Sequence, residues 1–325
     1  MSMKKNIIKL IVALLIAVVA TTAICFLILY IKNSYNIYEL KLKETKNEEI
    51  KILFVGDIMF DRGIRYFADK NGGNEFILQR IKNVLLNNDL VVANLEGPIT
   101  DEKSISLGTI PGSKNNYFFT FDKSIAKTLF NHNIRLVGLN NNHILNFGRE
   151  GLESTKKYLD QATIKYFGAP DEERSIIIDL KGLKIAFVAY NEFTQNYNVE
   201  KAETIEEIKN IKKYVDFVVV FCHWGTEYKL IANELQISLA HEFIDTGASL
   251  IIGAHPHVVQ QKEDYNEKRI YYSLGNFVFD QYFSEDVRKG MGVIWKINKN
   301  TKEIKFEEIN FYLENNGQTS LITTK

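Results

Sequence analysis

The sequence predicts an α/β fold built on mixed β-sheets, and three observations support that prediction. Short apolar runs of strand length alternate with segments of helical periodicity through most of the chain. Many of these runs end in Asp, Glu, Asn or His, the side chains that gather at the carboxyl edge of such sheets. The last two runs follow one another without a helix between them, which indicates an antiparallel margin. A composition of 46% hydrophobic and 25% charged residues over 325 positions is that of a globular protein.

The first 49 residues differ in character from the rest. A short basic tail, 1–9, precedes the uncharged apolar stretch 10–31, which has about the length that a helix needs to cross a bilayer. A cleavable signal peptide is the alternative, but the apolar run is longer than a signal peptide requires, so we predict a retained transmembrane anchor. Lysines on the two sides of this stretch balance, so they do not decide its orientation. The polar segment 32–49 is predicted to be a spacer.

The folded domain is predicted to span 50–313, followed by a C-terminal tail, 314–325. Strands are predicted, in chain order, at 50–55, 90–93, 134–139, 175–180, 183–190, 217–221, 250–252, 269–274, 292–297 and 304–313. Helices are predicted at 76–86, 124–130, 149–159, 205–214 and 235–244. The fourth and fifth strands form a hairpin about Lys181-Gly182, and the polar stretch 100–116 is expected to be a long loop.

Charge and cysteine content exclude some classes of protein. Lys plus Arg and Asp plus Glu both number 40, so the chain lacks the basic excess of a protein whose main task is to bind nucleic acid. The two cysteines, Cys25 and Cys222, cannot build a disulfide framework, because the first lies in the predicted anchor and the second at a predicted strand. We therefore expect no nucleic-acid partner.

Metal-compatible side chains follow five of the predicted strands. They are Asp57, Glu96, Asn142, His143, His223, His255 and His257. Loops at the carboxyl ends of strands gather on one edge of an α/β sheet, so these side chains are expected to converge. Neutral imidazoles suit Zn²⁺, Mn²⁺ or Fe²⁺, and a carboxylate can bridge two ions. The pattern predicts a divalent-metal site with one or two ions.

Six motifs occur along the sequence in an order that resembles a known protein family. They read Gly56-Asp57-Ile58-Met59, Asn94-Leu95-Glu96-Gly97-Pro98, Asn141-Asn142-His143, His223-Trp224-Gly225-Thr226-Glu227, Gly253-Ala254-His255-Pro256-His257-Val258 and Ser273-Leu274-Gly275-Asn276-Phe277. Over about 50–297, the sequence resembles the CapA family of capsule or poly-γ-glutamate synthesis proteins, also called PgsA. That family is similar in fold to the calcineurin-like metallophosphoesterases. The resemblance implies a metallophosphoesterase-like α/β sandwich of mixed sheets and an extracytoplasmic domain on a single-pass membrane anchor.

The resemblance also implies roles for the site residues. Asp57 and His257 would bind one metal ion, and Glu96 would bridge to a second. Asn142, His223 and His255 would complete the coordination of the second ion. His143 would be the catalytic residue that protonates a leaving group or steadies developing charge, while a bridging hydroxide attacks.

Two positions depart from the expected pattern. Met59 stands where the phosphoesterases have a His, and its thioether is a poor ligand for hard divalent ions. Asn146 stands where the family pattern is expected to carry Asp, so this position lacks a charge. Both departures place catalytic activity in question.

Other residues are expected to wall or support the site. They are the motif residues Asn94, Trp224, Glu227 and Asn276, together with Arg62 just after the first strand. Arg62 would either meet an anionic substrate or lie in water, and Trp224 would either wall the site or pack in the core.

The resemblance implies action in the synthesis, release or export of an anionic capsule polymer such as poly-γ-glutamate. Expected partners are the polymer or its membrane synthase and export subunits. Two alternatives stay open: a metal-dependent phosphodiesterase or phosphatase at the cell surface, and a non-catalytic subunit that binds the polymer or synthase.

Overall fold

The computed structural model describes residues 48–170, 172 and 174–322, together with 3, 5, 7, 9, 15, 21, 22, 24 and 26–35. The chain divides into two compact units, 1–49 and 50–325. In the first unit, 26–35 is helical, while most of the predicted anchor and spacer lies outside the described residues. Within the described residues, no helix has both the length and the apolar character that crossing a membrane requires. The anchor therefore stays a prediction.

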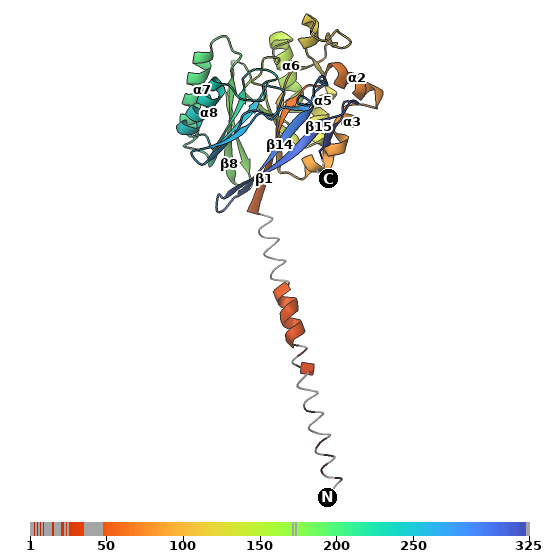
Figure 1. Ribbon diagram of the computed structural model, residues 1–325, viewed down its shortest axis with the longest axis vertical. Coiled ribbons are helices and arrows are strands. Elements are labelled where there is room, and N and C mark those ends of the chain that lie inside the picture. Colours follow the sequence, from red (N-terminus) through yellow and green to blue (C-terminus); the bar gives the residue numbers. More distant parts are fainter. Residues whose placement is uncertain are drawn as a thin grey trace. The chain divides into compact units, whose positions relative to one another are not determined.

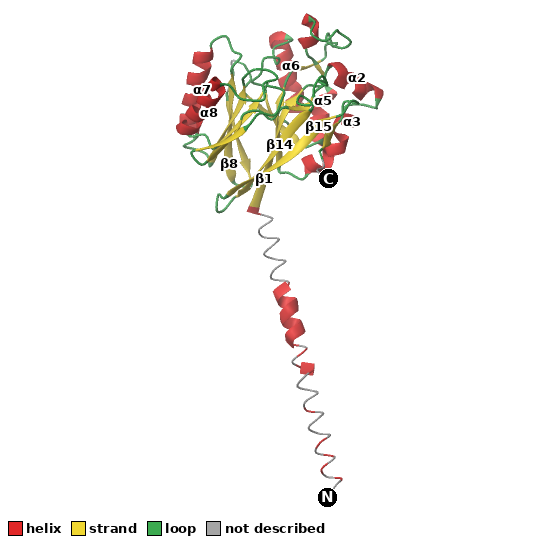
Figure 2. Ribbon diagram, viewed as in Figure 1, coloured by secondary structure: helices red, strands yellow, loops and turns green. Residues whose placement is uncertain are grey.

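The second unit contains two large β-sheets with helices on both outer faces (Figure 1, Figure 2). The eight-stranded sheet contains β1 (Glu49–Ile58), β2 (Leu90–Leu95), β5 (Ile134–Gly138), β6 (Lys165–Phe167), β13 (Asn276–Val278), β14 (Lys289–Asn298), β15 (Ile304–Leu313) and β16 (Thr319–Leu321). The six-stranded sheet contains β7 (Ser175–Leu180), β8 (Leu183–Asn191), β9 (Phe217–His223), β10 (Leu250–Ala254), β11 (Lys262–Tyr265) and β12 (Lys268–Tyr271). A small third sheet pairs β3 (Ile99–Thr100) with β4 (Phe121–Asp122).

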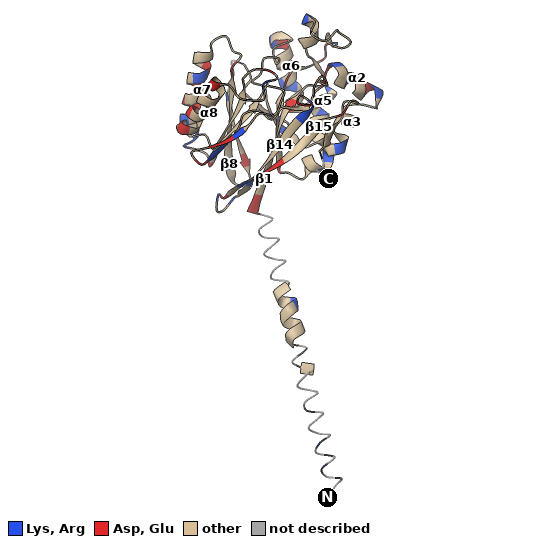
Figure 3. Cartoon of the chain, viewed as in Figure 1, with Lys and Arg blue, Asp and Glu red and all other residues tan. Residues whose placement is uncertain are grey.

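Helices cover the outer face of each sheet. On the eight-stranded sheet these are α2 (Arg62–Lys70), α3 (Glu75–Leu78), η1 (Gln79–Ile81), α4 (Lys82–Leu86), α5 (Ser124–Asn131) and α6 (Gly148–Gln161). On the six-stranded sheet they are α7 (Tyr197–Ile211) and α8 (Glu234–Thr246), and a short η2 (Lys114–Tyr117) lies in the loop before β4. Acidic and basic residues are interspersed on α6 and α7 (Figure 3).

Strand β1 shows why this stretch folds as a central strand. Its residues alternate between two cores: Leu53 and Val55 pack with the helices, and Ile52 and Phe54 pack between the sheets. A strand buried on both faces requires such a continuous apolar run, because successive side chains point to opposite faces. Between the sheets, the Phe54 ring lies 6.3 Å from that of Phe187 and 6.4 Å from that of Trp295.

The centre of each sheet is parallel. β1, β2, β5 and β6 pair in parallel in the larger sheet, as do β8, β9, β10 and β12 in the smaller one. Antiparallel pairs form the margins, including the predicted hairpin of β7 with β8 and the predicted pair of β14 with β15. The expected mixed α/β architecture is therefore confirmed.

Several local features differ from expectation, and four of them bear on the sheets or their helices. Arg62–Lys70 forms a helix that was not predicted, because its nine residues carry few apolar side chains. The predicted helix 76–86 is broken by a 3₁₀ turn at Gln79–Ile81. The short strand β13, beyond the predicted strand 269–274, pairs with β1. The expected tail 314–325 contributes β16, whose pairing with β15 extends the sheet beyond Leu313.

Candidate metal centre

The polar ends of several parallel strands meet at one place. Asp57 ends β1 and lies in register with Asn94 of β2 and Asn276 of β13. In the other sheet, His223 ends β9 and lies in register with Ala254, the residue before His255. Because parallel strands end at the same edge, both sheets deliver side chains to a shared centre.

Within the part of the chain that the structure describes, Asp57, Glu96 and His257 form a close group of metal-compatible side chains. One ligand atom from each lies within 4.8 Å of the others, and all three residues are buried. His257 Nδ1 is 3.3 Å from Asp57 Oδ2, and His257 Nε2 is 3.5 Å from Glu96 Oε1. The predicted pairing of Asp57 with His257 is thus present in the geometry, with Glu96 beside both.

The turn after β10 aims both of its histidines into the structure. His255 and His257 have φ angles of 94° and 58°, a region that non-glycine residues rarely adopt. Such strain persists where the surrounding structure holds it, and it is concentrated at functional sites. Gly253, just before this turn, allows β10 to approach the segment at Tyr272. A Cβ added at Gly253 would lie 1.9 Å from the Tyr272 carbonyl oxygen.

A second group lies beside the first. His223 Nε2 is 2.8 Å from Asn142 Oδ1, and the rings of His223 and His255 are 4.8 Å apart between centroids. These are the three side chains that the resemblance assigned to a second metal ion. The Phe193 ring packs 4.1 Å from that of His255 and 5.7 Å from that of His223.

Asn94 connects the two groups. Its Nδ2 donates to Asp57 Oδ1 at 2.7 Å and lies 3.3 Å from His223 Nδ1. Its Oδ1 accepts from Asn141 Nδ2 at 3.0 Å, and Asn141 Nδ2 also donates to the Leu95 carbonyl oxygen at 2.9 Å. Sequence reasoning gave Asn141 no role of its own. Its position in the motif was the available signal.

The two buried carboxyl groups have opposite protonation tendencies. Burial raises the pKa of Glu96 well above its ordinary value, and the nearby charge of Asp57 raises it further. Burial also acts to raise the pKa of Asp57, but hydrogen bonds from His257 and Asn94 outweigh this and lower it. Without a cation, the surroundings therefore favour the protonated form of Glu96 and the ionised form of Asp57.

Burial favours the uncharged form of His143, His223 and His255. It lowers the pKa of His143 to about 4 and that of His255 to about 3, and the charge of His257 adds to both shifts. Burial and the neighbouring His255 lower the pKa of His223 well below its usual value. Neutral imidazoles are the form that binds a metal ion.

His143 stands next to the group rather than in it. Its Nε2 lies 3.8 Å from Glu96 Oε1, and its Nδ1 lies 3.2 Å from Asn146 Oδ1. Asn146 Oδ1 also accepts from the Phe119 backbone N–H at 2.8 Å. Asn146 thus orients His143 without a charge, with Nδ1 as the protonated nitrogen and Nε2 facing the carboxylates.

Met59 supplies no ligand. It is fully buried in the core beneath the helices, and its sulfur accepts from the Asp61 backbone N–H at 3.0 Å. Asn276 supports the site from another side, because its Oδ1 lies 3.0 Å from His257 Nδ1. Nδ1–H donation to Asn276 leaves His257 Nε2, near Glu96, for a metal ion.

The remaining predicted wall residues are dispersed. Arg62 pairs with Asp280 at 2.5 Å and lies over the rings of Phe119 and Phe279. Trp224 lies in the core below α7 and α8, where its Nε1 donates to the Tyr272 carbonyl oxygen at 2.9 Å, so it does not wall the site. The charge of Glu227 contributes to the raised pKa of Glu96.

The donor set fits a divalent ion. Among the described residues, Glu96 Oε1 and His255 Nδ1 are buried polar atoms without a hydrogen-bond partner. Leaving such atoms unpaired costs free energy that a bound cation would recover. The mixture of carboxylate oxygen and imidazole nitrogen suits Mn²⁺, Zn²⁺ or Fe²⁺.

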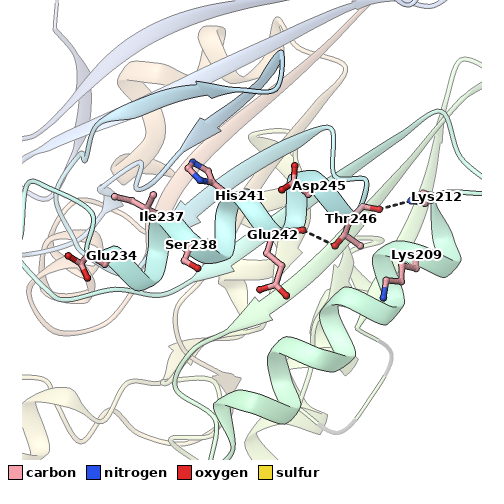
Figure 4. Close-up of a pocket in the computed structure, with 9 residues that line it drawn as sticks. All are labelled: Lys209, Lys212, Glu234, Ile237, Ser238, His241, Glu242, Asp245 and Thr246. Atoms are coloured by element: carbon pink, nitrogen blue, oxygen red, sulfur yellow. Dashed lines mark hydrogen bonds between the residues drawn. The ribbon is translucent and has the colours of Figure 1, made fainter.

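A separate groove between α7 and α8 does not have a donor set of this kind. It encloses about 790 Å³ and is lined by the side chains shown in Figure 4. Lys212 Nζ donates to the Thr246 carbonyl oxygen at 2.6 Å, and Lys201 pairs with Glu242 at 2.9 Å. His241, on its rim, bonds Glu263 at 2.8 Å. Lys212, Glu242 and His241 are therefore already engaged within the protein.

Fold and site together define an α/β sandwich protein with a buried carboxylate and imidazole centre at its strand ends. The chain belongs to the bacterial capsule synthesis protein family PGA_cap, whose model matches residues 51–281. This confirms the resemblance carried by the six motifs.

Known proteins extend the comparison. The PGA biosynthesis protein CapA of Bacillus subtilis (strain 168) is 31% identical over 257 residues, which cover 74% of this chain and 66% of that protein. The capsule biosynthesis protein CapA of Bacillus anthracis is 29% identical over 261 residues, covering 74% and 62%. The chain thus spans slightly less than two thirds of the length of these relatives. A crystal structure of a hypothetical protein from Thermus thermophilus shares the fold, with a TM-score of 0.50, 16% identity, and coverage of 81% of this chain and 99% of that one.

Proposed function

We propose that this protein acts in the synthesis, release or export of an anionic capsule polymer such as poly-γ-glutamate, through a divalent-metal site. Membership of the capsule synthesis family supports the biological setting. The observation that carries the site is the buried group Asp57, Glu96 and His257, with Glu96 Oε1 lacking a partner among the described residues.

The residues of the site divide the chemical tasks. Asp57, Glu96 and His257 would hold one ion, and His223, His255 and Asn142 offer ligands for a second. A bound divalent ion supplies a water of lowered pKa and neutralises developing negative charge. His143, held by Asn146 with Nε2 directed at the site, takes up a proton at that atom and returns it to a leaving group.

We further propose that 10–31 anchors the protein in the cell membrane, with the folded domain on the extracytoplasmic side. The length and apolar character of that stretch support the anchor. Protease added to intact cells should degrade the domain while the membrane fraction retains the N-terminal segment. Recovery of the full chain in the soluble fraction would contradict the anchor.

Metal analysis of the purified full chain tests the site. We expect about one equivalent or more of Mn, Zn or Fe in the natural sequence, and a loss of at least tenfold in metal affinity in His257→Ala, because one of three close ligands is removed. His241→Ala is the matched control, since His241 lies on α8 away from the site and contacts Glu263 of β11. Equal metal content in both variants would remove Asp57, Glu96 and His257 as the site.

A polymer assay tests the function. In a producing cell whose own gene is deleted, the natural sequence should restore polymer yield or release, and His257→Ala should not. Restoration by His257→Ala would favour the non-catalytic subunit. His143 lies beside the metal group, so we also expect a generic phosphodiester to be a useful probe. Turnover lost in His143→Ala, with no change in polymer, would favour the cell-surface phosphodiesterase.

A further inference from the structure

A pocket of about 730 Å³ opens beside the metal centre. Asn141 and Asn142 line both the pocket and the site, and Phe193 lines the pocket while packing against His255. Its volume falls within the range that holds small molecules or one unit of a larger ligand. A group bound there would continue directly into the metal centre.

The charges of this pocket disfavour an anion. Arg174 is ion-paired with both Glu200 and Glu203, and Glu172 is paired with Lys156 at 2.6 Å. The lining therefore includes three carboxylates against one guanidinium, and that guanidinium is already engaged. Within the described lining, no cation is left to recognise a carboxylate or phosphate, so a γ-glutamyl unit, which carries a carboxylate, is a poor occupant.

The other polar groups of the lining are mainly neutral amides. They belong to Asn140, Asn141, Asn142, Asn191, Gln195 and Asn196. A carboxamide both donates and accepts hydrogen bonds, as a hydroxyl or acetamide group does in return. Gln195 and Thr194, which are exposed in the pocket, have no hydrogen-bond partner within the described part of the chain. They are available to a ligand.

An apolar surface completes the lining. Phe193, Leu145 and Val199 are between 41% and 47% exposed, so they offer apolar surface to a ligand in this pocket. A ligand with one apolar face and several hydroxyl groups would cover this surface while satisfying the amides. Sugar rings have this combination.

We propose that the pocket binds an uncharged saccharide unit, which places the group attached to that saccharide at the metal centre. The second half of the proposal rests on the proposed function, whereas saccharide binding itself depends only on the pocket. The occupant is distinguished from an anionic polymer by its lack of charge.

Calorimetric titration of the full chain in detergent and EDTA tests the pocket without metal chemistry. The probes are chitotetraose and maltotetraose, both uncharged, and a γ-glutamate oligomer of similar length. We expect at least one saccharide to bind more tightly than the γ-glutamate oligomer. The double variant Thr194→Ala, Gln195→Ala should weaken saccharide binding by about fivefold, the loss expected for a neutral hydrogen bond.

Val199→Trp should abolish saccharide binding by filling the pocket, and Ser238→Trp in the groove between α7 and α8 is the matched control. Failure of both saccharides to bind, preference for the γ-glutamate oligomer, or binding unaffected by Val199→Trp would overturn the proposal. The result is separable from the metal test: a chain without metal that still binds saccharide loses only the metal site, and a metal-loaded chain that binds no saccharide loses only the pocket.

Discussion

Asn94 shows how a single uncharged side chain organises the site. It bonds Asp57 and Asn141 and lies beside His223, so it connects residues from both sheets. Because an amide carries no net charge, it can fix these neighbours without changing the charge that a metal ion would meet. Sequence reasoning placed Asn94 only as a supporting residue. The contacts with Asp57, Asn141 and His223 depend on tertiary structure that no local pattern displays.

The buried histidines predict loss of stability in acid. The pKa of His143 is about 4 in the folded chain, against about 6.5 in an unfolded chain. Below about pH 6.5 the unfolded state takes up a proton that the folded state does not, so the free energy of unfolding falls as the pH decreases toward 4. Each such group contributes at most about 1.4 kcal/mol per pH unit.

Urea unfolding of the metal-free chain at pH 7, 6 and 5 measures this effect. His143→Gln should make the decrease in stability less steep, by up to about 1.4 kcal/mol per pH unit. His241→Gln, at a partly exposed position, should leave the slope unchanged. An unaltered slope in His143→Gln would show that this imidazole is not the group that resists protonation.

Among the secondary-structure elements, the central strands and their polar ends could be predicted from the sequence. The continuous apolar runs of β1, β2, β9 and β10 identify buried parallel strands, and the polar residue that follows each run marks the site edge. Short elements were not predictable. β13 and β16 have three residues each, and their pairing partners supply most of what makes them strands. α2 was missed because only a few of its residues are apolar.

Pocket residues such as Phe193 were also beyond prediction. Phe193 follows β8 in an irregular segment, and its contact with His255 joins positions far apart in the chain. Likewise, Trp224 follows a metal-compatible histidine in sequence but lies in the core, because successive side chains of an extended segment point in opposite directions. The position of a residue in a motif therefore does not decide whether its side chain faces the site or the core.

The approach of β13 to β1 predicts a strict requirement for glycine. A Cβ added at Gly56 would lie 1.8 Å from the Gly275 carbonyl oxygen. Gly56→Ala should reduce the free energy of unfolding by about 3 kcal/mol and lower metal affinity, because β1 must shift and carries Asp57 with it. Gly182→Asn, in the open β7–β8 turn, should cost less than about 1 kcal/mol. Chemical unfolding and metal titration of both variants measure the difference.

At the scale of the whole domain, the candidate metal site joins the two sheets. Asp57 lies at the end of β1 and Glu96 follows β2 in the eight-stranded sheet, and His257 follows β10 of the six-stranded sheet. A ligand that binds only the folded state stabilises it by an amount set by its concentration relative to the dissociation constant. Metal binding should therefore resist separation of the sheets.

Thermal unfolding with Mn²⁺ or Zn²⁺ and with EDTA tests this connection. At a thousandfold excess over the dissociation constant, the metal should add about 4 kcal/mol, or about 10 °C in midpoint for a domain of this size. The increase should vanish in His257→Ala and persist in His241→Ala. An equal increase in both variants would place the bound metal elsewhere.

The strand order also sets when the site can form. β1, near the start of the domain, lies between β2 and β14 in the sheet and pairs with β13. Asp57 consequently completes its surroundings only when Asn276, more than two hundred residues later, has been synthesised. Contacts of such long range slow folding, since the intervening chain must first be ordered. A growing chain released before β13 would carry every histidine of the site but lack Asn276, whose Oδ1 lies 3.0 Å from His257 Nδ1. We therefore expect metal capture to begin only after that strand has been made.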